Sequence, residues 1–156
     1  MTLTYAFTEK DVIGASGDSL LVYLAGHNSL GQQQPDFLAL EMVGRQVRFL
    51  WNAGGGTTVL THPLKLQPSP DGLTDDSRWY KIEAERTGNV GSLKVRPVKA
   101  PDDDSTSSTS SSSMDEGTTV TGAGPPRFTK MDLVTGNKLY VGRLPDNPPS
   151  DHKVYN

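Results

Sequence analysis

The chain has 156 residues, with 15 basic and 18 acidic side chains and a formal charge of −3, so bulk charge gives no reason to expect a nucleic acid partner. It contains no cysteine, which excludes disulfides, thiolate metal sites and cysteine nucleophiles. No apolar run reaches the length of a membrane span, and the first ten residues lack the basic and apolar regions of a signal peptide. We therefore expect one domain without membrane insertion, from a cytosolic protein or from part of a longer chain.

Apolar and polar residues alternate with the period of a β-strand in short segments along the chain. The segments are 2–8, 19–25, 37–43, 46–52, 57–61, 79–86, 91–98 and 138–144. No window of helical length carries an apolar stripe. Many short strands between turn residues predict an all-β fold, an antiparallel β-sandwich with one apolar face of each sheet buried.

The segments 37–43 and 46–52 form a predicted hairpin around Gly44 and Arg45. Glycine at the first central position indicates a type II′ turn. The apolar face then pairs Met42 with Val47, Leu40 with Phe49, and Leu38 with Trp51. On the other face Glu41 lies opposite Arg48, which predicts an ion pair on the solvent side.

A second hairpin, with Gly88 and Asn89 at its turn, joins the segments 79–86 and 91–98. Its register pairs Ala84 with Leu93, Ile82 with Val95, Glu83 with Lys94, and Lys81 with Arg96. This hairpin also has one apolar and one charged face.

On the charged face of that hairpin Lys81 lies opposite Arg96, with Arg78 and Lys94 nearby, and these four residues make up a predicted basic patch. Like charges directly opposite each other are unfavourable, which suggests an anionic or sulfated glycan as a weak binding partner. Glu83 and Glu85 dilute the positive charge, so an ordinary solvated face is the favoured alternative.

The composition changes abruptly in 101–127, where three aspartates precede a Ser/Thr run and then Gly and Pro. Such a segment cannot bury enough apolar surface to offset the ordering of its backbone. We expect a disordered loop inserted into a single module of residues 1–156, acting as a solvated spacer or as an acceptor of O-glycans.

Enzymatic chemistry finds little support in the sequence. His27, His62 and His152 lie in separate segments without a recognisable nucleophile and are expected at the surface. Glu83 and Glu85 share a strand face and would be the acids of a glycosidase, but Glu83 already faces a lysine. A non-enzyme is expected.

The segments 18–26, 36–54, 75–88 and 139–145 together resemble the laminin G-like modules. The amino-acid sequences of 79–82 and 49–52 are most similar to those of the first such module of a laminin alpha chain. The resemblance implies a concanavalin A-like, laminin G-like jelly roll. The family's first strand and its closing strands are missing from this sequence, so a sandwich truncated at both ends is expected.

Calcium is the cofactor that the resemblance implies. The hairpin register places Asp36 opposite Ala53, and carboxylate and carbonyl oxygens are the ligands that calcium prefers. In calcium-binding members of the family these positions supply a side chain and a carbonyl, respectively. The resemblance implies a second pair, the Lys130 carbonyl and the Asp132 carboxylate. Alternatively Asp36 only caps a turn and Asp132 is an ordinary loop acid.

The implied function is non-enzymatic recognition and adhesion by a secreted module in the extracellular matrix of basement membranes. Its expected partners are cell-surface receptors of the integrin type, dystroglycan or sulfated glycans, and the laminin beta and gamma chains through the parent chain. A neurexin-like or lectin-like module that binds a glycan or a receptor is the alternative. A glycoside hydrolase on a related sandwich is less favoured.

Overall fold

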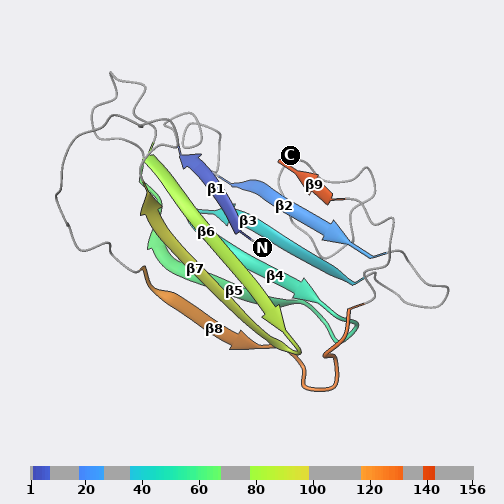
Figure 1. Ribbon diagram of the computed structural model, residues 1–156. Helices are drawn as coiled ribbons and strands as arrows, with labels where there is room; N and C mark the ends of the chain where they lie inside the picture. Colours follow the sequence, from blue (N-terminus) through green and yellow to red (C-terminus); the bar gives the residue numbers. More distant parts are fainter. Residues whose placement is uncertain are drawn as a thin grey trace.

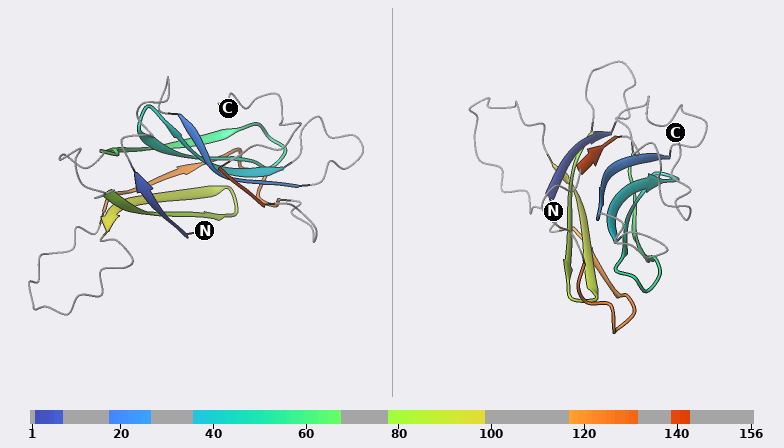
Figure 2. Two further views of the ribbon diagram at one scale, coloured as in Figure 1. Left: turned by 90° about the horizontal axis from the view of Figure 1, so that it is seen from above. Right: turned by 90° about the vertical axis from the view of Figure 1, so that its right-hand side faces the viewer.

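The computed structural model describes residues 2–7, 18–26, 36–67, 78–98, 117–131 and 139–142, with only the backbone given for 2–7 and for Arg78. These residues form nine strands in two antiparallel sheets, with the orders β1-β6-β7-β8 and β5-β4-β3-β2-β9. The bounds are β1 Thr2–Phe7, β2 Ser19–Ala25, β3 Phe37–Val43, β4 Gln46–Asn52, β5 Thr58–Lys65, β6 Arg78–Thr87, β7 Val90–Val98, β8 Thr119–Ala123 and β9 Leu139–Val141. The sheets face each other as two layers (Figures 1 and 2). The expected antiparallel β-sandwich is confirmed.

Most predicted strands coincide with observed ones because alternation fixes which residues can share a buried face. β2, β3 and β4 have the predicted bounds. β5 continues beyond the predicted 57–61 as far as Lys65 and includes Pro63. Proline is tolerated there because β5 is an edge strand, where one side of the backbone needs no ladder hydrogen bond.

The main apolar core lies between the two sheets. It joins β2, β3 and β4 of one sheet to β6 and β7 of the other through alternating side chains. Its least exposed members are Leu40, Met42, Val47, Phe49, Trp51, Leu66, Ile82, Leu93 and Val95. Removal of this apolar surface from water is the main force that holds the layers together.

Both hairpins have the predicted registers, but the first turn is of another type. Gly44 and Arg45 have φ angles of 54° and 66°, so both central residues are left-handed and the turn is type I′, not type II′. The prediction assumed that Arg45, which carries a side chain, would have a negative φ, but its φ is positive, a conformation that residues other than glycine adopt uncommonly. In the second hairpin Gly88 has a φ of 61°.

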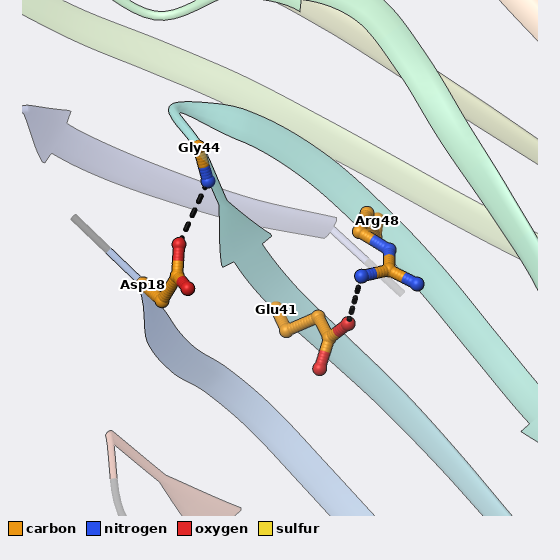
Figure 3. A network of polar contacts seen from close by, with 4 residues as sticks. All are labelled: Asp18, Glu41, Gly44 and Arg48. Carbon is orange, nitrogen blue, oxygen red and sulfur yellow. Dashed lines mark hydrogen bonds and ion pairs between the residues drawn. The ribbon is translucent and has the colours of Figure 1, made fainter. Parts of the chain in front are cut away.

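The ion pair between Glu41 and Arg48 is not on the solvent side as predicted. Arg48 Nη1 lies 3.3 Å from Glu41 Oε1, but Glu41 is only 5% exposed (Figure 3). Its side of the sheet carries a second apolar cluster, formed by Leu20, Tyr23, Phe37, Ala39 and Leu50. The five-stranded sheet is therefore buried on both faces over part of its area, and alternation alone cannot reveal this.

Part of the predicted disordered loop is ordered. β8 lies inside the predicted 101–127 and pairs with β7 from Lys94 to Val90. Threonine and valine favour strands, and Gly122 lets β8 approach so closely that a Cβ there would lie 2.5 Å from Leu60 Cδ2. The prediction is wrong for this strand, while residues 101–116 lie outside the described part of the chain.

His62 is buried in the structure, so the expectation that it is a surface residue is wrong. It is 1% exposed and lies on β5 between the partly buried Leu60 and Leu64, which pack on the core. Its Nδ1 accepts a hydrogen bond from the Leu64 N–H at 3.1 Å, so Nε2 carries the proton and donates to the Thr118 carbonyl at 2.8 Å. The neutral ring thus connects the two sheets.

Candidate functional site

The predicted oxygen pair lies at the end of the sandwich where β3 begins and where the arrowheads of β4, β6 and β8 gather (Figure 1). At this end, loops from both sheets meet. We define the Asp36 rim as Asp36, residues 52–56, Arg86 and residues 124–128.

Asp36 and Ala53 flank the last pair of the β3–β4 ladder, where the predicted register puts them. This ladder ends at Phe37 and Asn52; Asp36 directly precedes β3 and Ala53 directly follows β4. Asp36 is 5% exposed, and its carbonyl accepts a hydrogen bond from the Gly26 N–H at 2.6 Å. A carboxylate buried to this extent needs a positive charge or several donors nearby.

The glycine run after Ala53 is held in a defined loop by Asn52. The Asn52 side-chain oxygen accepts hydrogen bonds from the Gly54 N–H at 2.8 Å and from the Gly56 N–H at 3.2 Å. Gly54 and Gly56 have φ angles of 92° and 101°, which side chains rarely allow. This part of the rim is an ordered loop capped by an amide.

The aromatic ring of Phe128 lies directly on this loop. A Cβ built at Gly55 would lie 2.2 Å from Phe128 Cδ2, so only glycine allows the ring to approach this closely. The segment after β8, which belongs to the four-stranded sheet, thereby packs on a loop of the five-stranded sheet.

Arg86 is a functional candidate that the sequence interpretation missed. It continues the alternation of Tyr80, Ile82 and Ala84, which face the core. Its Nη2 donates a hydrogen bond to the Phe128 carbonyl at 3.0 Å. Burial lowers the pKa of the Arg86 guanidinium, while attraction to the Asp36 carboxylate raises it. A basic residue in an inward-facing position was the available sequence signal.

The described part of the rim does not fit a calcium ion as it stands. Asp36 and Ala53 offer two oxygens, but the Arg86 guanidinium already acts on the carboxylate. Within the described segments no three His, Cys, Asp or Glu side chains cluster as metal ligands. Lys130 is exposed between β8 and β9, and Asp132 lies outside the described residues. Calcium binding at these four residues stays a prediction.

Three residues of the predicted basic patch, Lys81, Lys94 and Arg96, lie on the outer face of the four-stranded sheet. Lys81 pairs with Arg96 and Glu83 pairs with Lys94 across β6 and β7, as expected. The carboxylate of Glu83 forms an ion pair with Lys81 Nζ, at 2.9 Å, along its own strand. This hydrogen bond, with the nearby charges of Lys81, Arg96 and Lys94, lowers the pKa of Glu83. Arg78 begins β6, and its side chain is not described.

A two-layer antiparallel sandwich, with ordered loops at one end and a charged outer sheet face, places the chain in the class of all-β sandwich proteins. A family model described as the laminin G domain matches residues 14–155, and the chain belongs to this family. The resemblance seen in the sequence is thereby confirmed.

Among relatives, laminin subunit alpha-1 of Homo sapiens is 33% identical over 127 residues, which cover 81% of this chain and 3% of that protein. Cadherin EGF LAG seven-pass G-type receptor 1 of Homo sapiens is 26% identical over 167 residues, which cover 100% of this chain and 5% of that protein. The chain thus spans only a small part of either relative.

Among solved structures, mouse laminin alpha1 chain, domains LG4-5, superposes with a TM-score of 0.51 at 19% identity, covering 99% of this chain and 29% of that one. At this identity the likeness supports the fold alone. No helix in the described segments is long and apolar enough to cross a bilayer.

Proposed function

We propose that this chain is a non-catalytic recognition module of a secreted, laminin alpha-type protein of the extracellular matrix. It contributes to cell-surface receptor binding and to basement membrane assembly. Family membership and the similarity to a laminin alpha chain support this proposal. The laminin beta and gamma chains would join it only through the parent chain, because the module is a small part of such a protein.

The observation that carries the proposal is the opposition of Lys81 and Arg96 across β6 and β7, with Lys94 on the same face. Like charges directly opposite each other destabilise a sheet unless something neutralises them. Glu83 neutralises one of the three through its ion pair with Lys81, and Glu85, exposed on the same face, offsets part of the rest. The remaining positive charge suits the sulfate or carboxylate groups of a glycan on a receptor, such as dystroglycan or a sulfated proteoglycan.

The test is retention of the purified chain on a heparin column under a salt gradient. Wild type should be retained at low salt, and Lys81→Ala with Arg96→Ala should elute earlier, because exposed charges act over about 10 Å at 0.1 M salt. Lys65→Ala is the matched control, since Lys65 is exposed on β5 of the other sheet. Wild type in the flow-through, or an equal loss in the control, would remove the glycan from the proposal.

The two alternative functions, a neurexin-like or lectin-like module and a glycosidase, are tested by different observations. A neurexin-like or lectin-like module would bind a glycan or receptor through the same face, so the sequence around this module in its parent chain distinguishes it from a laminin. A glycosidase would require Glu83 as a catalytic acid, yet Glu83 is held by Lys81. Turnover of chromogenic glycosides that is lost in Glu83→Gln would establish an enzyme.

A further inference from the structure

We propose that the guanidinium of Arg86 is the built-in cation of the Asp36 rim, and that it takes the place of a divalent metal ion there. The ordered loops of this end would then form without calcium. This inference goes beyond the proposed recognition function, which depends on the outer face of the four-stranded sheet.

The first support is the position of Arg86 in the sheet. Arg86 pairs with Gly91 across β6 and β7, next to the turn of the hairpin. A Cβ at Gly91 would lie 2.6 Å from Trp51 Cη2, so this cross-strand pair sits directly over the Trp51 ring. Trp51 precedes Asn52 and Ala53 in β4. An inward-facing side chain at position 86 therefore extends toward the same end of the core as Ala53.

The second support is the tether between Arg86 and the glycine loop. Arg86 Nη2 donates to the Phe128 carbonyl at 3.0 Å, and the ring of the same phenylalanine lies on Gly55. Gly54, which follows Ala53, also lies close to this ring, because a Cβ there would be 3.4 Å from Phe128 Cδ1. The guanidinium is thus linked through one residue to the loop that carries the expected carbonyl ligand.

The third support is charge. Asp36 is nearly buried, and its carboxylate attracts the Arg86 guanidinium. Arg86 Nε is itself buried and has no hydrogen-bond partner among the described residues, so the charge of Asp36 helps to offset its loss of solvation. A planar guanidinium is well suited to a buried pair with a carboxylate because it is weakly hydrated and always charged.

A calcium ion at Asp36 and Ala53 would have to lie close to this guanidinium. Two positive charges in a partly dehydrated site repel each other more strongly than in water. Either the ion stays away or the arginine must leave its hydrogen bond to Phe128. The carboxylate cannot serve both cations equally well, and the covalently attached one loses less translational freedom.

The experiment compares thermal unfolding of the chain in millimolar calcium chloride and in a calcium chelator. The wild-type midpoint should be the same in both. Arg86→Gln should lower the midpoint in the chelator, and Arg86→Lys should lower it less because the charge remains. Adding Asp36→Asn to Arg86→Gln should lower the midpoint by less than the sum of the single changes, since either change alone removes the attraction between the two charges.

Arg48→Gln is the matched control. Arg48 is a partly buried arginine that pairs with Glu41, away from the rim. Its combination with Asp36→Asn should be additive, as expected for distant sites. A wild-type midpoint that rises in calcium, with the rise lost in Asp36→Asn, would overturn the proposal. Additive effects of the Asp36 and Arg86 changes would do so as well. If Arg86→Gln does not fold, the wild-type comparison and Arg86→Lys still decide.

Discussion

At the scale of single residues, four charged groups contribute in ways that exposure alone would not suggest. Arg86 lies on the inner face of its sheet, donates a hydrogen bond to the Phe128 carbonyl at the rim, and is attracted by the charge of Asp36. Glu41 is buried beside Arg48. These groups stabilise particular loops and pairs only where an opposite charge or a donor offsets the loss of water.

Residue positions were predicted better than residue environments. Turn length and alternation predict the register of β3 and β4 that puts Glu41 opposite Arg48 and Asp36 beside Ala53 at the open end. The structure shows this register from the Phe37–Asn52 pair to the turn. Burial of Glu41 depends on an apolar cluster on the outer face, to which Tyr23 and Leu50 contribute. Alternation with a period of two residues predicts which face of the sheet a side chain lies on, but not whether other residues bury that face.

Glu41→Gln provides a test of this burial at the residue level. Burial raises the pKa of Glu41 above its ordinary value of 4.5, the Arg48 charge opposes the shift, and the Asp18 charge adds to it. A raised pKa in the folded state means a stabilising contribution that is complete below pH 4.5 and is lost as the pH rises through the raised pKa.

We therefore expect Glu41→Gln to be at least as stable as wild type at pH 7, with wild type gaining relative to the variant as the pH falls toward 4.5. Urea unfolding of both proteins across this range measures the difference. A variant that is less stable at pH 7 and recovers in acid would show that the ion pair outweighs burial. Asp18 also accepts a hydrogen bond from the Gly44 N–H at 2.7 Å (Figure 3), so it must stay unchanged in the comparison.

At the scale of elements, the sandwich depends on contacts between edge strands that are distant in sequence. His62 on β5 donates to the carbonyl of Thr118, directly before β8. Since β5 and β8 are edge strands of different sheets, this bond closes one side of the sandwich. β8 was not predicted from the sequence, because its five residues of Thr, Val, Gly and Ala show little apolar alternation beside a long Ser-rich run in 101–127.

His62→Leu should lower the free energy of unfolding by about 1–3 kcal/mol. The apolar side chain would leave the Thr118 carbonyl and the Leu64 N–H without their partner, and an unsatisfied buried group costs this amount. Chemical unfolding at neutral pH is the measurement. Thr61→Ala, at the exposed neighbouring position, is the control and should change stability by less than about 0.5 kcal/mol. A similar effect in both variants would mean that the histidine does not bridge the sheets.

At the scale of the whole molecule, the two candidate regions have different tasks. The outer face of the four-stranded sheet presents Lys81, Lys94 and Arg96 to solvent as half-buried side chains. The Asp36 rim is an internally connected end in which one arginine, one phenylalanine and a glycine loop contact each other. We infer that the sheet face recognises an anionic ligand and that the rim provides a stable end without an ion.

The sequence predicted the family and the sandwich because several short motifs occur in the family's order, and the family match over residues 14–155 agrees. It predicted the oxygen pair of the rim but not its cation. The resemblance pointed to Asp132, whereas Arg86 reaches the rim, where it binds the Phe128 carbonyl, only when the two sheets are stacked. Pairing within a sheet follows from local patterns, and packing between sheets does not.

The most direct test is a titration of the isotopically labelled chain with a heparin oligosaccharide, followed by backbone amide NMR. This division of tasks between the sheet face and the rim predicts chemical-shift changes concentrated on the outer face of β6 and β7, around Lys81, Lys94 and Arg96. The amides of Gly54 and Gly56 should be unchanged, with no difference between calcium and chelator. Shifts concentrated at the Asp36 rim that appear only in calcium would contradict it.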